Sequence, residues 1–160
     1  LTLDNGAHIV TQQFLDSFLI LSGSGITFGL VIAMLFAAKS KQYKALGKVA
    51  AFPAIFNVNE PIVFGFPIVM NPVMFLPFIL VPVLAALIVY GAIAVGFMQP
   101  FSGVTLPWST PAIISGFMVG GWQGALVQIV ILAISTAVYF PFFKIQDNIT
   151  YKNECEMERV

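Results

Sequence analysis

Charge is nearly absent from the middle of this sequence. Between Lys48 and Lys144 the one charged side chain is that of Glu60, and over all 160 residues 9% are charged while 59% are hydrophobic. A globular surface in water usually carries about a quarter charged residues, so this composition excludes an ordinary soluble domain. The mean hydropathy of +0.95 indicates an integral membrane protein or a part of one.

Other absences exclude whole classes of function. The single cysteine, Cys155, excludes an intrachain disulfide and a cysteine-based metal site. The single histidine, His8, has no second histidine to complete a zinc site and no context for a Ser-His-Asp arrangement. We interpret it as a polar surface or cavity-rim residue, and we predict no metal and no cofactor. A net charge of zero offers no basic face, so nucleic acid is not an expected partner.

The ends of the chain differ from its middle. The sequence begins at Leu1 and shows no basic segment ahead of a short apolar core, so no signal peptide is visible. We expect a fragment whose upstream part is absent. Residues 1–143 are predicted to form one membrane unit, and residues 144–160 a polar tail that frays.

Three apolar stretches are long enough to cross a bilayer as helices. A span takes roughly 20 residues, because hydrocarbon cannot satisfy backbone hydrogen bonds. The stretches are Ser17 to Ala38, Val73 to Met98 and Trp122 to Phe143. We therefore predict three transmembrane helices.

Two of these spans contain residues with special packing properties. Gly23-Ser24-Gly25 and Gly29 give the first span a patch of small residues, which serves helix packing alone or the lining of a substrate path. Prolines 72, 77 and 82 each remove a backbone donor from the second span and should kink it.

The two segments between the spans are too apolar for aqueous loops. They are Ala51 to Pro72 and Phe101 to Gly121, and both are rich in proline and glycine, which prevents a continuous helix. Such backbone occurs at membrane depth only where protein covers it or where it lines a watery cavity. We predict two re-entrant hairpins, with apolar interfacial loops as the alternative.

Lysines set the predicted orientation. Four of them lie between Lys39 and Lys48, directly after the first span, and Lys144 directly follows the third. The positive-inside rule places the stretch from Lys39 to Lys48 and the C-terminal tail in the cytoplasm. The first hairpin then enters from the cytoplasmic side and the second from outside, so that their tips can meet.

The segment from Lys39 to Lys48 is predicted to be an amphipathic interfacial helix. Lys41, Lys44 and Lys48 share one helical face, which favours a helix lying along the membrane surface. Its role is anchoring or, alternatively, docking of a cytoplasmic partner. The predicted fold class is thus an all-α membrane protein with three transmembrane helices, two re-entrant hairpins and this interfacial helix.

Glu60 is the leading candidate for a functional residue. Asn59-Glu60-Pro61 is typical of a helix start, but a neutral cap would avoid the cost of burying a carboxylate. The carboxylate gains something only from polar hydrogens: sugar hydroxyls, a cation or a proton. Amides of Asn57, Asn59 and Asn71 favour a polyhydroxylated, uncharged ligand over a cation. Capping alone is the alternative.

A second candidate is Trp108, in the run Leu106-Pro107-Trp108-Ser109-Thr110-Pro111. An indole face can stack on the apolar face of a pyranose, and the flanking prolines would hold it in place. Membrane tryptophans also form interfacial belts. The sequence leaves both roles open for Trp108.

The run from Phe56 to Pro72 (FNVNEPIVFGFPIVMNP) closely resembles the signature of enzyme IIC of the bacterial phosphotransferase system, lactose/cellobiose/diacetylchitobiose branch. Gly23-Ser24-Gly25 upstream and Leu106-Pro107-Trp108 downstream follow in the expected order. The resemblance covers almost the whole chain, but it corresponds to the C-terminal, substrate-handling half of that family. The upstream spans that form most of the family's dimer interface, and its upstream histidine motif, are absent.

The resemblance implies a sugar permease of the bacterial plasma membrane. It would bind a β-linked disaccharide of the cellobiose, diacetylchitobiose or lactose type and present the 6-hydroxyl to a cytoplasmic IIB component, itself phosphorylated through IIA. Glu60 would hydrogen-bond the hydroxyl and assist its deprotonation, Asn59 would shape the site and Trp108 would stack on the sugar. The chain would be part of a protein-phosphohistidine-sugar phosphotransferase complex, would carry no identified phosphoacceptor of its own, and would form a homodimer through the absent upstream half.

Two other functions stay open at this point. A lone intramembrane carboxylate on a broken helix is also what an ion- or proton-coupled secondary transporter uses, with Glu60 as the coupling site. An interaction domain that stabilises a larger complex, with Glu60 as a cap, is the third. The residues do not name the disaccharide.

Overall fold

The computed structural model describes residues 25–66, 68, 70–97, 106–107 and 109–157. These residues contain α-helices and no strand, as the predicted fold class requires. The helices are α2 (Phe28–Ala37), α3 (Lys41–Ile55), α4 (Glu60–Gly65), α5 (Pro72–Ala94) and α6 (Ile114–Met157).

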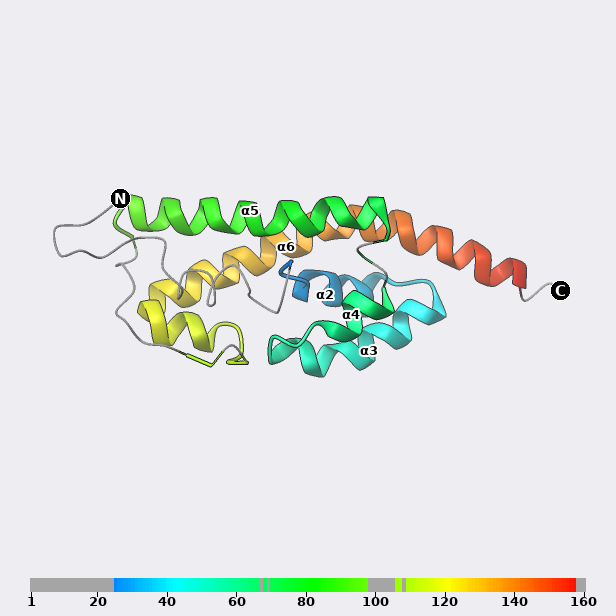
Figure 1. The fold of residues 1–160 in the computed structure, drawn as a ribbon, viewed down its shortest axis with the longest axis horizontal. Helices are drawn as coiled ribbons and strands as arrows, with labels where there is room; N and C mark the ends of the chain where they lie inside the picture. The colour runs from blue at the N-terminus through cyan, green and yellow to red at the C-terminus, as the bar shows by residue number, and fades with distance from the viewer. Residues whose placement is uncertain (1–24, 67, 69, 98–105, 108, 158–160) are drawn as a thin grey trace.

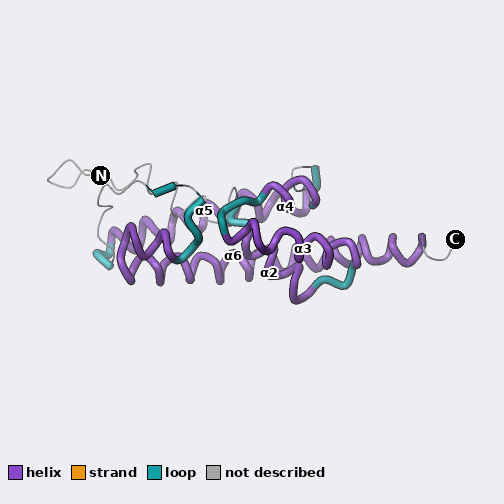
Figure 2. Tube along the Cα trace, turned by 90° about the horizontal axis from the view of Figure 1, so that it is seen from below, coloured by secondary structure: helices purple, strands orange, loops and turns teal. Residues whose placement is uncertain are grey.

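The helices are arranged around α6. Figure 1 shows α5 and α6 as the two long helices, with α2, α3 and α4 gathered on the other side of α6. Figure 2 shows the same helices from below, with the C-terminal part of α6 extending beyond the others. Direct packing links α2 and α5 to α6, α3 to α2, and α4 to α3. The helix α6 therefore connects the long apolar helix α5 to the cluster of shorter helices.

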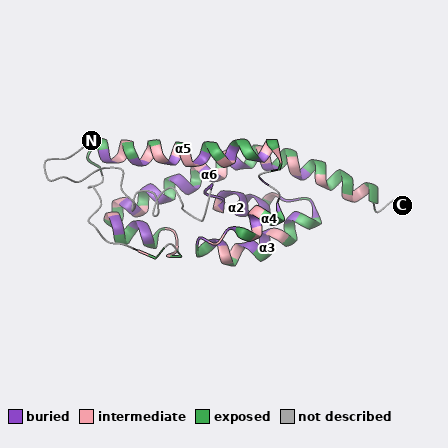
Figure 3. Cartoon of the chain, in the orientation of Figure 1, coloured by how far each residue is buried: buried purple, intermediate pink, exposed green. Residues whose placement is uncertain are grey.

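The helix α5 buries one stripe of side chains and exposes the rest. Its buried residues recur every three or four positions along the helix, as expected for one helical face: Met74, Pro77, Val81, Ala85, Val89 and Ile93. Leu76, Ile79, Val83 and Leu87 are apolar and exposed, and Figure 3 shows the exposed surface along the outer side of α5. An apolar outer face is what a helix in lipid presents.

Two helices of the described residues are long and apolar enough to cross a membrane, namely α5 and α6. With 23 residues, α5 is about 35 Å long at 1.5 Å per residue, enough for the hydrocarbon core. The helix α6 contains the third predicted span, and α5 covers the second predicted span as far as Ala94, after which residues 95–97 form a turn. The chain is an all-α membrane protein.

The first predicted span, Ser17 to Ala38, is not one continuous helix. Residues 25–27 form a turn with Gly25 at φ 81° and Ile26 at φ 51°, and the helix α2 begins only at Phe28. The turn is stable because α6 donates to its carbonyls: Tyr139 Oη to Gly25 O at 2.7 Å and Ser135 Oγ to Ile26 O at 2.7 Å. Residues 17–24 lie outside the described part of the chain.

The small-residue patch is confirmed at Gly29. A Cβ added there would lie 2.5 Å from both Ser135 Oγ and Thr136 N, so α2 and α6 reach their close packing only because this position is glycine. Gly23 and Ser24 lie outside the described residues.

Prolines interrupt the helices less than the sequence predicts. The helix α3 continues through Pro53 to Ile55, although the proline has no N–H to donate to the carbonyl four residues before it. The helix α5 passes through Pro77 and Pro82 as one helix without a sharp bend (Figure 1). Packing against neighbouring helices lets a membrane helix tolerate such prolines.

The prediction of a frayed tail is wrong for residues 144–157, which continue α6 as helix to Met157. Asp147, Thr150 and Glu154 lie at helical spacings of three and four and face the start of α3. Thr150 Oγ1 donates to Tyr43 Oη at 2.9 Å. These contacts to α3 order a segment whose composition alone suggests disorder.

Two carboxylates of this segment cap α3. Asp147 accepts from Lys39 N at 2.8 Å and Ser40 N at 3.1 Å, and Glu154 accepts from Lys41 N at 3.0 Å and Gln42 N at 3.1 Å. The Ser40 hydroxyl donates to Glu154 at 2.6 Å and accepts from Tyr43 N at 3.3 Å. Every early N–H of α3 thus has a partner, and the anionic charge opposes the positive end of the helix dipole.

The amphipathic character predicted for residues 39–48 is confirmed. Lys41, Lys44 and Lys48 are exposed along α3, whereas Tyr43 and Gly47 are buried against the rest of the molecule.

Replacing Asp147 by alanine should destabilise the protein by about 2 kcal/mol, because it leaves two backbone N–H groups without their acceptor in a largely buried place. The measurement is the unfolding midpoint of the purified protein in detergent. Glu156→Ala, an exposed carboxylate on the same helix, is the matched control and should leave the midpoint unchanged. Equal midpoints for the two variants would contradict the capping role.

The Glu154 cap should weaken in acid. The Ser40 hydroxyl, followed by the backbone N–H of Gln42, lowers the pKa of Glu154 below its ordinary value of 4.5. A carboxyl group whose pKa is lowered in the folded state stabilises the protein at pH values above its ordinary pKa. This stabilisation is lost as the pH falls through the folded-state pKa. Unfolding midpoints measured between neutral pH and strong acid should therefore fall more steeply for wild type than for Glu154→Gln. Parallel curves would refute the assignment.

Candidate functional site

The first hairpin turns at the end of α3. Val58 N donates to Pro53 O at 3.1 Å and Asn57 N to Ala54 O at 3.2 Å, which is the bonding pattern of a Schellman motif. The motif requires a left-handed residue directly after the cap, and Asn57 occupies that place with φ 62°. Asparagine tolerates this conformation better than most side chains do, so the local sequence encodes the turn.

The returning arm is α4, and it starts where the sequence predicts. Asn59 is its N-cap, Glu60 its first residue and Pro61 its second, and Asn59 O accepts from Ile62 N and Val63 N at 3.0 Å each. The side chains of Asn57 and Asn59 are buried, whereas Glu60 is exposed. The hairpin thus presents its carboxylate outward and keeps these two amides inside.

An aromatic cluster fixes α4 in place. The ring of Phe66, directly after α4, lies 4.6 Å from that of Tyr43 on α3 and 6.3 Å from that of Phe143 on α6, centroid to centroid. All three residues are buried. Because aromatic pairs at such distances add to the packing energy, the arm that carries Glu60 is held against both α3 and α6.

The segment before α6 forms the second tip. Thr110 N donates to Pro107 O at 3.0 Å and Thr110 Oγ1 to the same carbonyl at 2.7 Å, so Thr110 is held against Pro107. Asn57 Nδ2 donates to Thr110 O at 2.9 Å. The two hairpin tips therefore contact each other, as predicted. Trp108 lies outside the described residues.

After the second tip the chain forms a short helical arm, which begins at Ile114, and reverses at Gly121 into the long part of α6. Gly121 has non-helical angles (φ 62°, ψ −157°) inside α6, and Figure 1 shows the chain reversing there. The arm and the long part approach closely at two glycines, since a Cβ on Gly124 would collide with the carbonyl oxygen of Gly116. Gln128 and Ile113 are hydrogen-bonded across the reversal. The hairpin predicted over residues 101–121 thus includes a helical arm from Ile114 onward.

Similarity to known proteins identifies the family of this chain. The family model described as "Phosphotransferase system, EIIC" matches residues 2–82, half of the chain. The chain belongs to the phosphotransferase system EIIC family. This confirms the resemblance noted in the sequence.

Three of the matched proteins are named as IIC or EIIC components. The chain is 45% identical to the lichenan permease IIC component of Bacillus subtilis (strain 168) over 95% of its own length and 34% of the relative's. It is 49% identical to the cellobiose-specific EIIC component of Geobacillus stearothermophilus, with 88% and 32% covered. The crystal structure of the transporter ChbC, the IIC component from the N,N'-diacetylchitobiose-specific phosphotransferase system, matches with a TM-score of 0.88 and 40% identity over 91% of this chain and 34% of ChbC. The chain spans about a third of these proteins.

In this EIIC chain the charge at the tips comes from Glu60. Among the described residues of the two tips, it is the one ionisable side chain. The described residues hold no group of three or more His, Cys, Asp or Glu side chains that fits a metal ion. The chemistry available at the tips is thus one carboxylate, amides, hydroxyls and backbone groups.

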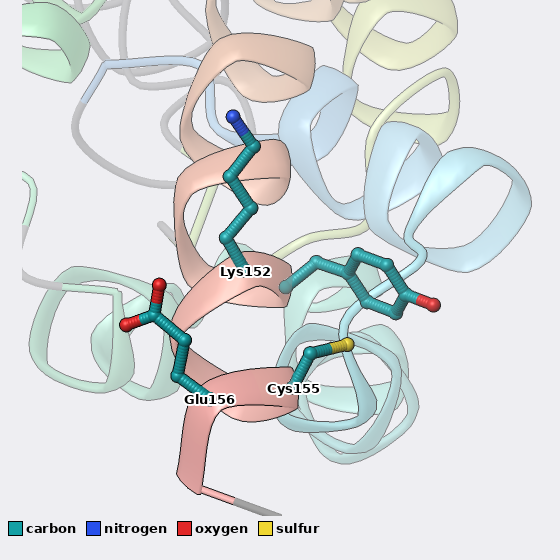
Figure 4. A pocket seen from close by; sticks show the side chains of 4 residues that line it. Lys152, Cys155 and Glu156 are labelled. Atoms are coloured by element: carbon teal, nitrogen blue, oxygen red, sulfur yellow. The ribbon is translucent and has the colours of Figure 1, made fainter. Parts of the chain in front are cut away.

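A shallow hollow of about 200 Å³ lies elsewhere, near the C-terminal end of α6, lined by Tyr151, Lys152, Cys155 and Glu156. In Figure 4 Cys155 and Glu156 project from opposite sides of the helix. The polar groups of this hollow do not converge, so it does not compete with the tips as a candidate site.

The sequence predicted the first tip but not the residues that bond the second tip and the start of α3. Thr110 was visible only as a neighbour of Trp108, and Gln128 and Asp147 carried no signal beyond being polar residues in or after an apolar span. A buried polar residue within a predicted span is the one clue that points to Gln128.

Two substitutions should separate the two contributions of Asn57 to stability, namely its left-handed backbone and its hydrogen bond to Thr110. Asn57→Gly keeps the left-handed turn and loses the bond to Thr110, so it should destabilise by about 1 kcal/mol. Asn57→Ala loses the same bond and keeps a Cβ in the left-handed region without the polar side chain that lets asparagine tolerate it, so it should cost roughly 1–2 kcal/mol more than Asn57→Gly. Unfolding midpoints in detergent should rank wild type, Asn57→Gly, Asn57→Ala. Equal midpoints for wild type and Asn57→Gly would show that the contact between the tips adds no stability.

Proposed function

We propose that this chain is the substrate-handling part of a phosphotransferase sugar permease that binds a β-linked disaccharide at the two hairpin tips. The observation that carries the proposal is the hydrogen bond from Asn57 Nδ2 to Thr110 O at 2.9 Å. It brings the motif around Glu60 next to residues 106–111, the two segments on which the family resemblance depends. Relatives named for cellobiose and diacetylchitobiose, both β-linked disaccharides, support the substrate class.

The chemistry of the tips suits a sugar. A disaccharide is uncharged and rich in hydroxyl donors, and a carboxylate accepts such donors in short, strong hydrogen bonds. In the proposed mechanism Glu60 accepts the hydrogen bond of the sugar 6-hydroxyl. IIB then transfers a phosphoryl group to that oxygen, and Glu60 takes up the hydroxyl proton. Asn57 and Asn59 shape the site, and Trp108 stacks on a sugar ring.

The packing of α6 supports the proposed orientation. Asp147 and Glu154, in the predicted cytoplasmic tail, cap the helix that carries Lys41, Lys44 and Lys48. The lysine-rich segment and the tail therefore lie at the same end of the molecule, as they must if both are cytoplasmic. IIB would approach the sugar from that side, and a homodimer would form through parts of the full-length protein outside this chain.

Glu60→Gln in the full-length protein should lower sugar affinity and uptake at least tenfold, because a hydrogen bond to a charged acceptor contributes about 1.5–3 kcal/mol. The measurements are binding of labelled cellobiose and diacetylchitobiose to purified protein, and phosphorylation-driven uptake into vesicles that contain the cytoplasmic components. Glu156→Gln, an exposed carboxylate far along the chain from the tips, should behave as wild type. Unchanged binding by Glu60→Gln would remove Glu60 from the site.

The same vesicles test the other two functions. A proton-coupled transporter would accumulate sugar without the cytoplasmic phosphocarriers and would stop when the proton gradient is collapsed. A purely structural role for Glu60 would change the assembly of the complex and leave uptake intact. A sugar phosphate that accumulates only with the phosphocarriers present is the result that the proposal requires.

A further inference from the structure

Gln128 is a fully buried amide in the middle of the apolar part of α6. Its Oε1 accepts from Ile113 N at 2.6 Å and Gly116 N at 3.1 Å, and its Nε2 donates to Ser115 Oγ at 2.9 Å. One side chain thus bonds three groups at the start of the helical arm that follows the second tip.

These groups need a partner from outside their own helix. The first N–H groups of a helix have no intrahelical acceptor, and this arm begins at Ile114. Ser115 N donates to Pro111 O at 3.1 Å, whereas Ile113 N and Gly116 N donate to Gln128. Ile113 also stands at φ 72°, a region that β-branched residues strongly disfavour, so the conformation persists only because its surroundings hold it.

The chain reversal at Gly121 brings the amide of Gln128 next to the start of the arm. A side chain at position 116 would meet the amide, since a Cβ there would lie 2.6 Å from Gln128 Oε1. Glycine at 116 and 124 therefore makes room both for the packed arms and for the amide between them. Methionine or leucine would fill the same space without a polar group to satisfy, but would leave two N–H groups without their acceptor.

The bonded groups lie next to the second tip. Thr110, whose carbonyl accepts from Asn57, precedes Ile113 by three residues. Residues 110–113 are therefore held at one end by the first hairpin and at the other by Gln128. We propose that Gln128 is a positioning residue for the sugar site: it fixes the second tip against the first without touching the sugar. This inference rests on the proposed function.

The test replaces Gln128 by methionine, which has a similar shape and no amide, in the full-length protein. Hydrogen exchange of peptides covering residues 106–120 should rise at least tenfold, because Ile113 N and Gly116 N lose their acceptor. The dissociation constants for cellobiose and diacetylchitobiose should rise about tenfold. Exchange in α5 should stay as in wild type, which a general loss of stability would not allow.

Two further variants keep the inference falsifiable. Gln123→Met changes the same residue type on the same helix and should alter neither exchange nor affinity. Gln128→Glu, in its protonated form, keeps an acceptor oxygen for both N–H groups and a donor for Ser115, so it should recover most of the protection and affinity.

The outcomes separate this inference from the proposed function. Wild type that binds neither disaccharide overturns the proposed function and, with it, the role assigned to Gln128. Wild type that binds, together with Gln128→Met of unchanged exchange or unchanged affinity, overturns the positioning role alone. Faster exchange in residues 106–120 with weakened binding, and recovery in Gln128→Glu, is the result expected.

Discussion

Every break in a helix at membrane depth leaves backbone groups that lipid cannot satisfy, and this structure depends on how those groups find partners. The long helix α6 supplies them from one side. Ser135 and Tyr139 donate to the carbonyls of the turn before α2, and Gln128 accepts from the start of the arm after the second tip. Further along α6, in its predicted cytoplasmic part, Asp147 and Glu154 cap α3 in the same way. Irregular backbone is tolerated here because side chains from the part of α6 after Gly121 satisfy its hydrogen-bonding groups.

The same constraint explains where the backbone is strained. Among the described residues other than glycine, φ is positive at Ile26, Asn57 and Ile113. Each has a side-chain hydrogen bond: Ser135 to the carbonyl of Ile26, Asn57 through its own amide to Thr110, and Gln128 to the N–H of Ile113. Of these three residues, Asn57 makes the contact between the tips and Ile113 follows Thr110, its partner, by three residues. Strain held by specific bonds fixes a site more tightly than a flexible loop would.

The hairpins and the carboxylate were predictable because their signals are local. Proline and glycine spacing marks the turns, and Asn59-Glu60-Pro61 marks a helix start. The break at residues 25–27 was not predictable, since a hydropathy window averages over three residues whose carbonyls are satisfied by α6. The tail was misjudged for the same reason. Asp147 and Glu154 are ordinary solvated acids in sequence, and only the fold shows that the start of α3 lies opposite them.

The hydrogen bonds also indicate different roles for the residues of the proposed site. The amide of Asn57 is buried and bonded to Thr110, so one of its two donors is committed to joining the tips. Glu60, three residues after Asn57, is exposed at the start of α4. Phe66, directly after α4, packs against Tyr43 of α3 and Phe143 of α6. A ligand that reaches the tips therefore meets the carboxylate before this amide. This arrangement favours recognition by Glu60 on a scaffold positioned by Asn57 and Gln128, rather than recognition shared equally among all the polar residues of the motif.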